Sequence, residues 1–259
     1  MAAPAPASRV SPFGARLRHW RGLRGISQLT LATEAATTAR HVSFLETGRS
    51  RPSRSMVIRL SEVLGLPLRE RNRLLEAAGL AAAYREAELD SATLAPYRAA
   101  IERLLRAHEP YPAMVVDGRY SVIDANAAAV ALFGPALVGS NLIRRYADEA
   151  ARAAIVNWPD VARAGLARIR ERARQVPDDD ELGGLVAIAE AAVADLPPGE
   201  APADELIVCP EFIAGDRVIR TIGMAARFDA VLEVTLDELR IELLYPADEV
   251  AEEFFRSRA

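Results

Sequence analysis

The stretch ISQLTLATEAATTARHVSFLETGRSRPS, residues 26–53, decides how the N-terminal part of this chain folds. Ser27 and Thr38 are good helix N-caps, and each is followed by apolar residues at helical spacing. Between the two runs, Ala36 and Thr37 interrupt the pattern. Two short helices joined by three or four residues have the spacing of a helix-turn-helix, so the stretch predicts that motif.

The helical pattern continues on both sides of this stretch and predicts five short helices over residues 11–79. Ser11 can cap the first helix and Ser53 the fourth. Gly48 stands where a residue in the left-handed conformation commonly ends a helix. We therefore expect an all-α unit at the N-terminus, built around the helix-turn-helix.

Charge is divided unevenly along the chain. Residues 1–79 carry thirteen arginines and five acidic residues, a net charge of +8, whereas residues 80–259 carry a net charge of −12. The whole-chain value of −4 conceals this division. A basic unit on an acidic body indicates that the first unit binds a polyanion.

Composition limits the class of protein. Of the 259 residues, 51% are apolar and 26% charged, the balance of a soluble globular protein with room for two domains. The apolar runs are too short and interrupted for a membrane helix, and the N-terminus lacks a signal peptide's apolar stretch. The single cysteine, Cys209, excludes an internal disulfide and favours a cytoplasmic protein. Three scattered histidines give no metal-ligand spacing, so neither a metal nor a cofactor is expected.

The periodicity changes after residue 110. A connecting helix, Ala95–Ala107, precedes two β-rich runs, 113–117 and 120–125, that predict a hairpin. The other expected elements are helices at 126–134, 147–175, 181–195 and 247–257, a mobile loop at 197–203, and strands at 205–213, 217–228 and 238–246. This order predicts an α+β domain with a five-stranded, mainly antiparallel sheet.

The segments ISQLTLA and HVSFLETG resemble the XRE-type (phage-repressor-like) helix-turn-helix. Two positions depart from that family's pattern, because Ala36 stands where Gly is usual and Thr37 where an apolar residue is usual. Ala36 must then tolerate the turn. The resemblance implies that Glu46 forms a structural ion pair with Arg21 and that Gln28 meets the DNA backbone.

Helix-turn-helix geometry places the N-terminal part of the second motif helix in the major groove. Arg40 is the main candidate to read a base, since a guanidinium can grip the N7 and O6 of guanine; contact with phosphate or solvent is the alternative. Phe44 is as well suited to packing within the protein as to touching a thymine methyl. The candidate DNA-binding residues are Gln28, Thr38, Ala39, Arg40, Ser43, Phe44, Arg49 and Arg51, the last two as phosphate contacts.

The second half resembles a PAS-like sensor and, more closely, the ligand-binding domain of MmyB-like regulators. The resemblance rests on HEPYPAMVVDGRYSVIDANAAAVALFG, NLIRRYADEAARAAIVNW and PDDDELGGLV, and a usual Ser-x-Glu-Phe-x-x-x-Trp stretch is missing. It implies a regulator with a pocket for a fatty-acid-like effector. The expected domains are a disordered tail at 1–10, the XRE-type domain at 11–84, a connecting helix or linker at 85–109, and the MmyB-like domain at 110–259.

Strand 217–228 would place Arg220 on an otherwise apolar face, where it needs an anionic partner or a route to water. Arg220 would hold a ligand carboxylate, or it lies near the strand end or pairs with a carboxylate such as Asp124 or Glu211. The candidate ligand-binding residues are Met114, Val116, Ile123, Phe133, Arg220, Ile222 and Met224, and plain core packing is the alternative for the apolar ones.

The function expected is a sequence-specific, ligand-responsive DNA-binding regulator. It would bind a palindromic operator in double-stranded DNA as a homodimer, because one small motif reads few bases. The ligand would act through the helix at Ala95–Ala107. The alternative is that the second domain is a dimerisation or protein-interaction module without a small-molecule ligand. No nucleophile motif or phosphate-binding loop is present, so an enzyme is not expected.

Overall fold

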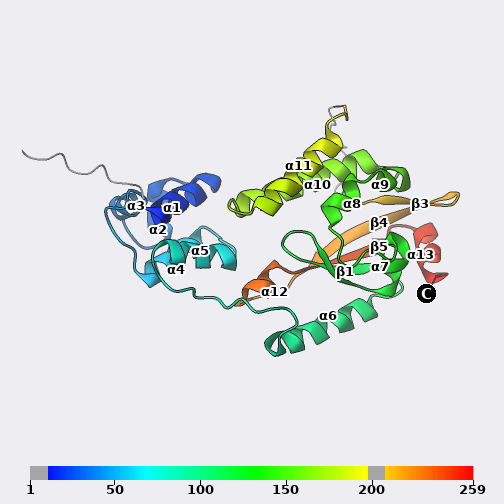
Figure 1. Ribbon diagram of the computed structural model, residues 1–259, viewed down its shortest axis with the longest axis horizontal. Helices are drawn as coiled ribbons and strands as arrows, with labels where there is room; N and C mark the ends of the chain where they lie inside the picture. The colour runs from blue at the N-terminus through cyan, green and yellow to red at the C-terminus, as the bar shows by residue number, and fades with distance from the viewer. Residues whose placement is uncertain (1–10, 198–207, 259) are drawn as a thin grey trace, which may run out of the picture. The chain divides into compact units, whose positions relative to one another are not determined.

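The computed structural model describes residues 11–197 and 208–258, which form two compact units (Figure 1). The predicted tail at 1–10 and residues 198–203 of the predicted loop lie outside the described residues. The first unit runs to Glu86 and also contains Leu232–Asp237. The second contains Ala87–Val231 and continues from Glu238. A short piece of the last third of the chain therefore folds with the N-terminal unit.

The first unit is helical, as predicted. Four of its helices begin with a serine or threonine whose side-chain oxygen accepts a hydrogen bond from the backbone N–H three residues on, which confirms the predicted caps at Ser11, Ser27, Thr38 and Ser53. The helices are α1 (Pro12–Leu23), α2 (Gln28–Glu34), α3 (Ala39–Glu46), α4 (Arg54–Val63), α5 (Leu68–Ala77) and the short α12 (Val234–Glu238), whose last residue already belongs to the second unit. The sequence pattern missed α12, and it wrongly began a strand at residue 238.

The turn between α2 and α3 is built on Ala36. Its φ is +49°, in the left-handed region that L-residues other than glycine, asparagine and aspartate seldom adopt. The N–H of Thr37 donates to the carbonyl oxygen of Ala32 at 2.8 Å, and that of Ala36 to Thr33 at 3.2 Å. These bonds complete a Schellman motif around a residue that has a Cβ. Alanine therefore takes the place of glycine in the turn, as the sequence predicted.

Helices α1 and α3 approach each other very closely at Gly14. A Cβ added to Gly14 would lie 2.4 Å from the backbone oxygen of Glu46 and 2.7 Å from that of Leu45. Both contacts are shorter than real Cβ contacts, and backbone atoms have little freedom to move away. The glycine is therefore required by packing rather than by a turn.

The close approach brings α1, α2 and α3 around one buried charge, the carboxylate of Glu46, which is 0% exposed. Its Oε1 accepts from Arg21 Nε at 2.7 Å, and its Oε2 accepts from Arg21 Nη2 at 3.2 Å and Gln28 Nε2 at 2.8 Å. Arg18 Nε lies 3.5 Å from the same Oε2. The predicted pairing of Glu46 with Arg21 is confirmed.

Burial opposes ionisation of Glu46, but the hydrogen bonds from Arg21 and Gln28 and the charges of Arg21 and Arg18 outweigh it. The pKa of Glu46 is consequently held below its ordinary value. The same partnership raises the pKa of Arg21. Glu46 is thus a stable anion that joins three helices of the first unit.

The second unit is an α+β domain, as predicted (Figure 1). Its connecting helix, α6, spans Ala95–Ala107 and ends before Pro110, as expected. The other elements are η1 (Ala92–Leu94), β1 (Ala113–Val116), β2 (Val122–Ala125), α7 (Ala127–Phe133), α8 (Leu142–Ala147), α9 (Glu149–Ala154), α10 (Trp158–Gln175), α11 (Asp180–Val193), β3 (Glu211–Ala214), β4 (Arg217–Ala226), β5 (Arg240–Pro246) and α13 (Glu249–Arg256).

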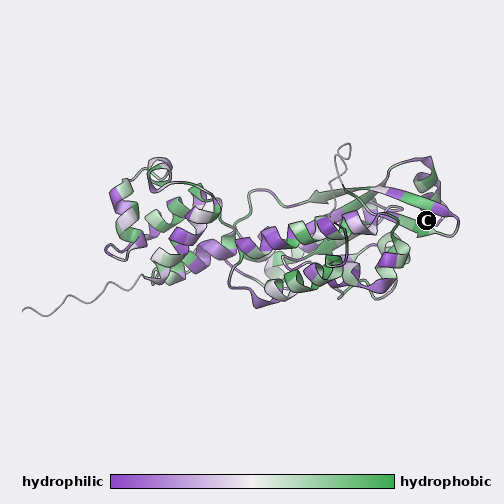
Figure 2. Ribbon diagram, turned by 90° about the horizontal axis from the view of Figure 1, so that it is seen from above, coloured by the Kyte–Doolittle hydropathy of each residue, from purple (hydrophilic) through white to green (hydrophobic). Residues whose placement is uncertain are grey.

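The sheet has the order β2-β1-β5-β4-β3, and all its neighbouring strands are antiparallel. In the view of Figure 1, α6 lies on one side of this sheet and α10 and α11 lie on the other. Figure 2 shows hydrophilic and hydrophobic residues alternating along these helices, as amphipathic elements require. The predicted five-stranded antiparallel sheet is confirmed.

Two details of the second unit differ from the prediction. The helix expected over 147–175 is interrupted at Ile155, whose extended backbone forms an isolated bridge to Phe212 of β3. The buried face of β4 is also the opposite of the predicted one, because Ile219 and Thr221 are inward while Arg220 and Ile222 are exposed. Apolar alternation alone marked the wrong face of this strand. Among residues 11–197 and 208–258, no helix combines the length and hydropathy needed to cross a membrane.

We expect Ala36→Gly to raise the free energy of unfolding of the first unit by about 0.5–1 kcal/mol. Glycine removes the strain of about 1–2 kcal/mol at positive φ but gains conformational freedom in the unfolded chain. Ala35→Gly is the matched control, since Ala35 has a φ of −84° and is buried; it should destabilise. Urea unfolding followed by Trp20 fluorescence, in a Trp158→Phe background, measures both. A loss of stability in Ala36→Gly would contradict the role of the turn.

We expect Glu46→Gln to destabilise the first unit by about 3 kcal/mol at neutral pH, because it leaves Arg21 without its charged partner. The lowered pKa of Glu46 means that the carboxylate contributes fully above its unfolded pKa and less as pH falls through the folded pKa. The difference between wild type and variant should therefore shrink in acid. Urea unfolding at about pH 7 and about pH 4 tests this sign; a difference that grows in acid would contradict it.

Candidate functional site: recognition helix and ligand cavity

The outer surface of α3 carries the side chains expected to meet DNA. Val42 and Leu45 are fully buried and anchor the helix to the core of the first unit, whereas Arg40 is exposed. Ser43 and Phe44 are half-buried beside it. The helix therefore presents a polar and aromatic surface whose direction is set by its apolar face.

Phe44 lies between two arginines. The guanidinium carbon of Arg40 is 5.2 Å from the centre of its ring, and that of Arg49 is 5.9 Å away. Both distances are within the range of cation–π attraction. Phe44 thus restrains the two charges, which favours its packing interpretation over contact with a thymine methyl.

Three other predicted DNA contacts have structural partners in the first unit. Gln28 donates a hydrogen bond from its side-chain Nε2 to the carboxylate of Glu46. The Oγ1 of Thr38 accepts from the N–H of His41 at 3.1 Å and caps α3. Ala39 is half-buried and packs against the apolar core. Each of these residues positions the motif, and only Thr38 among them is exposed.

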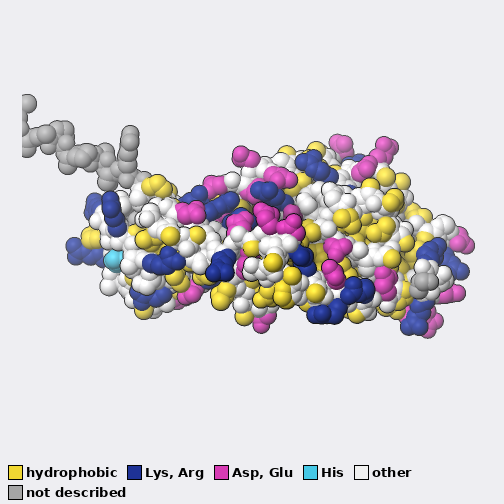
Figure 3. Space-filling model, turned by 60° about the horizontal axis from the view of Figure 1, so that its bottom comes forward, with side chains coloured by type: hydrophobic (Ala, Val, Ile, Leu, Met, Phe, Trp, Pro, Cys, Tyr) yellow, Lys and Arg dark blue, Asp and Glu magenta, His cyan; other side chains and the backbone are white. Residues whose placement is uncertain are grey.

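The C-terminal end of α3 is followed by two exposed arginines, Arg49 and Arg51. Gly48 has a φ of +75°, and Arg49 N–H donates to the Phe44 carbonyl oxygen at 2.8 Å, so the predicted glycine stop is confirmed. Arg51 makes no hydrogen bond or ion pair with any residue that the structure describes. In Figure 3 the left-hand unit, which contains these helices, shows mainly basic side chains among its charges.

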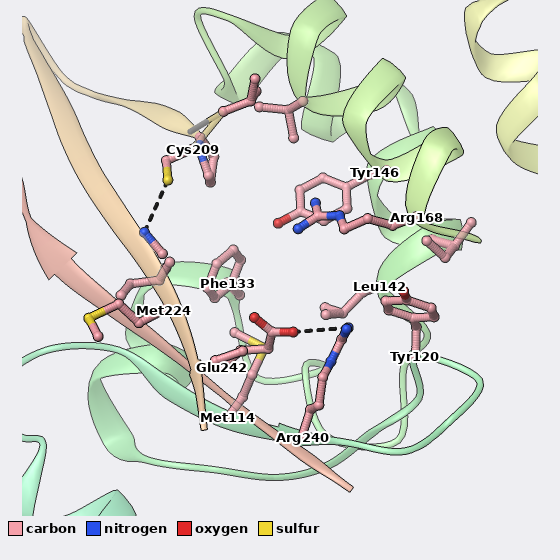
Figure 4. A pocket seen from close by; sticks show the side chains of 18 residues that line it. Met114, Tyr120, Phe133, Leu142, Tyr146, Arg168, Cys209, Met224, Arg240 and Glu242 are labelled. Atoms are coloured by element: carbon pink, nitrogen blue, oxygen red, sulfur yellow. Dashed lines mark hydrogen bonds and ion pairs between the residues drawn. The ribbon is translucent and has the colours of Figure 1, made fainter. Parts of the chain in front are cut away.

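A cavity of about 200 Å³ lies in the second unit between the sheet and three helices. Its floor is formed by β1, β4 and β5, and its other walls by α7, α8, α10, Tyr120 and residues 208–210 (Figure 4). On β4, the inward positions beside it are Gly223 and Ala225, which pair with Leu244 and Glu242 of β5. Small residues at these positions leave space above the sheet.

Two polar groups that line this space, half-buried Tyr146 and exposed Arg168, have no partner among the described residues. Tyr146 of α8 and Arg168 of α10 lie side by side in Figure 4. Within the described part of the chain, neither the Tyr146 hydroxyl nor the Arg168 guanidinium makes a hydrogen bond or an ion pair. Burial raises the pKa of the Tyr146 phenol, against a smaller opposing effect of the Arg168 charge. At neutral pH the phenol is therefore protonated and able to donate a hydrogen bond.

The opposite side of the cavity carries a paired charge. Arg240 Nη2 lies 3.1 Å from Glu242 Oε1, and the Arg240 guanidinium carbon lies 4.9 Å from the centre of the Tyr120 ring. Of the two arginines among the described lining residues, Arg240 is paired and stacked, whereas Arg168 has no described partner.

A second cavity of about 250 Å³ adjoins the first. Phe133, Leu142 and Tyr146 line both cavities and separate them. The second cavity is lined mainly by alanine and larger apolar side chains, including Leu132, Ile155 and Phe212. An elongated ligand could span both spaces if the separating side chains moved.

Of the predicted ligand-binding residues, Met114, Phe133 and Met224 line the first cavity. The other four, Val116, Ile123, Arg220 and Ile222, do not. Val116 is fully buried in the core beside β2, and Ile222 is 43% exposed on the outer face of β4.

Arg220 is a correction to the predicted anion site. Its Nε lies 3.6 Å from Glu211 Oε1 and its Nη1 lies 3.4 Å from Asp248 Oδ2. The side chain is 55% exposed, so it faces solvent with protein carboxylates as partners. The alternative interpretation, pairing with a carboxylate such as Glu211, is the one that holds.

Sequence reasoning missed the polar residues of the cavity. Tyr146, Arg168, Arg240 and Glu242 each stand in a segment rich in charged residues, and no spacing sets them apart. The alternation of Arg240, Glu242 and Leu244 on β5 was the available signal, because it puts two charges on an inward face. No cluster of His, Cys, Asp and Glu among the residues described is arranged to hold a metal ion.

Comparison with family models gives two matches. Residues 12–74 match a helix-turn-helix domain, and residues 97–205 match the MmyB-like transcription regulator ligand binding domain. A search of curated proteins found no match. The first match covers the helices around Glu46, and the second includes Phe133, Tyr146 and Arg168 of the cavity. The chain is therefore a helix-turn-helix transcription regulator with a C-terminal MmyB-like ligand-binding domain.

Proposed function

We propose that this regulator binds a specific operator and that its operator affinity changes when an apolar ligand with an anionic group occupies the cavity. The observation that supports the ligand is that the Tyr146 hydroxyl and the Arg168 guanidinium lie side by side in a mainly apolar space and have no partner in the described part of the chain. A guanidinium holds a carboxylate through charge-assisted hydrogen bonds, and a protonated phenol adds another.

The size of the cavity favours a slender ligand. The two adjoining cavities, of about 200 and 250 Å³, are each smaller than the usual site for a drug-sized molecule. A fatty-acid-like chain would place its carboxylate at Arg168 and its tail past Phe133 and Leu142 into the second cavity. The path between the two cavities opens when the side chains that separate them rotate, and it needs no change in the backbone fold.

On the DNA side, we propose that Arg40 reads a base and that Arg49 and Arg51 hold phosphates. Phe44 supports this division, since its ring restrains the two arginines that flank it. The regulator would act as a homodimer on paired half-sites, because a single recognition helix contacts few base pairs.

A second candidate function rests on a different surface. Ile222 on the outer face of β4 is 43% exposed, and Ile213 on β3 is 50% exposed. Exposed apolar residues on adjacent strands suit a protein-interaction or dimerisation module without a small-molecule ligand. Native mass spectrometry of the purified protein separates the candidates, since a stoichiometric amphiphile supports the sensor and an empty dimer supports the module.

We expect Arg40→Ala and Arg51→Ala to affect DNA binding differently. Loss of a base contact should reduce the ratio of operator to random-DNA affinity by about tenfold or more. Loss of a phosphate contact should weaken both affinities alike and reduce the slope of log K against log salt by about 0.9. Fluorescence anisotropy across a salt series, with a duplex selected from a random pool, measures both quantities. Equal loss of specificity in the two variants would contradict the division of roles.

We expect Arg168→Gln to weaken binding of dodecanoate by about tenfold, because a charge-assisted hydrogen bond is lost. Binding of the neutral analogue dodecanol should stay within about twofold. Arg170→Gln is the matched control, since Arg170 lies on the same helix and pairs with Glu190 in an exposed ion pair. Calorimetry on the full chain measures all of these affinities. Equal weakening of acid and alcohol would assign Arg168 to packing and remove its proposed role.

A further inference from the structure

The peptide between β4 and β5 does not fold with its neighbours in the sequence. β4 ends at Ala226 and β5 begins at Arg240, yet Leu232–Asp237 belongs to the DNA-binding unit. We call Leu232–Asp237 the α12 segment. Its Val234 is 0% exposed, and the N–H of Val234 donates to the carbonyl oxygen of Arg85 at 2.8 Å. The segment is therefore an ordered part of that unit.

Asp237 completes the start of α5. Pro67 occupies the N-cap position of this helix and has no side-chain oxygen to satisfy its first amides. Asp237 Oδ2 accepts instead from the N–H of Leu68 at 3.0 Å, from 169 residues further along the chain. A carboxylate at this position satisfies an amide that α5 cannot satisfy itself and complements the positive end of the helix dipole.

Through α5, this cap is connected to the packing of the recognition helix. Leu74 and Leu75 of α5 are fully buried in one apolar core with Val42 and Leu45 of α3. Dense cores transmit displacement rather than absorb it. The position of α5 is thus one determinant of how α3 is held.

The next residue, Glu238, belongs to the ligand-binding unit. Its Oε1 accepts from Arg172 Nη2 at 2.9 Å, and both side chains are largely buried, at 14% and 18% exposure. Arg172 also donates from Nε to the carbonyl oxygen of Gly118 at 3.1 Å. It lies on α10 four residues after Arg168, so one helix face carries both the cavity arginine and the residue that holds Glu238.

We propose that the Asp237–Glu238 pair couples the ligand cavity to the DNA-binding unit. Asp237 is a positioning residue for α5, and Glu238 is held by α10, the helix that carries Arg168. A single peptide bond joins the two anchors, so their Cα atoms remain about 3.8 Å apart. A shift of α10 or β5 when the cavity fills then acts on the cap of α5. The direction of regulation by ligand rests on the proposed function, whereas the mechanical link does not.

The link can be tested without a ligand by Glu238→Gln in the full-length protein. Releasing Arg172 should raise hydrogen-exchange rates of the amides of residues 68–71 by about fivefold and change operator affinity by at least about threefold. Glu190→Gln is the matched control, because Glu190 pairs in an exposed salt bridge with Arg170, which lies on α10 like Arg172. It should leave both quantities at their wild-type values. Wild-type exchange and affinity in Glu238→Gln would overturn the proposal.

The ligand-dependent arm uses Asp237→Ala and Asp237→Asn with dodecanoate as the probe. Asparagine keeps an acceptor for Leu68 and alanine does not. In Asp237→Ala, the ratio of operator affinities with and without dodecanoate should fall toward one while the Kd for dodecanoate stays within about twofold; Asp237→Asn should retain most of the ratio. Asp229→Ala, in the exposed β4–β5 connection of the second unit, controls for the loss of an aspartate.

The outcomes separate the two proposals. If the wild-type protein binds no dodecanoate, or binds it without a change in operator affinity, the proposed ligand response fails for this probe and the exchange experiment still decides the link. If the wild type responds and Asp237→Ala responds equally, the coupling role of Asp237 is wrong although the sensor function stands.

Discussion

The helix-turn-helix depends on the buried carboxylate of Glu46. One anion on α3 receives hydrogen bonds from Arg21 of α1 and Gln28 of α2, so a single charge fixes three helices. An ion pair in this environment gives little net stability over an apolar packing, yet losing one partner is severe because the other charge stays desolvated. The network therefore enforces one arrangement. Because Gly14 lets α1 approach the backbone of Glu46, the outward direction of Arg40 follows from this arrangement.

The arginines of this protein also differ in whether they pair with a carboxylate of the protein, a difference that the net charge does not show. Arg21 is paired with Glu46 within the first unit, whereas Arg51 is exposed and has no partner among the residues described, as its proposed role as a phosphate contact requires. The same distinction holds in the second unit, where Arg240 is paired with Glu242 and Arg168 has no pairing within residues 11–197 and 208–258. The proposed DNA and ligand contacts therefore include arginines that have no partner among the described residues, while the paired arginines shape the surface around them.

Local signals in the sequence were sufficient for the helical unit and for the order of strands. Caps such as Ser27 and Thr38, and a glycine stop at Gly48, act within a few residues and are visible in the chain itself. The cavity was less predictable, since β4 buries Ile219 and Thr221 while its more apolar alternation, through Ile222, faces outward. The alternation of apolar residues indicates which face of a strand is more apolar. Where small residues line a cavity, the inward face is the less apolar one, so the alternation points to the wrong face. No local pattern indicates that Asp237 caps a helix that begins at Leu68.

The capping of α5 by Asp237 suggests a different connection through which ligand binding would affect the DNA-binding unit. The sequence suggested the helix at Ala95–Ala107 as the route, but α6 folds within the second unit and is bonded to it through His108 and Leu105. A tether at one end can leave two units free to move independently. The α12 segment folds with the first unit, where its last residue caps α5, and the chain on either side of it leads to strands that line the cavity. In the proposed coupling, a displacement of those strands reaches α5 through Asp237, and a shift of α5 or loss of its cap would alter the core that supports α3.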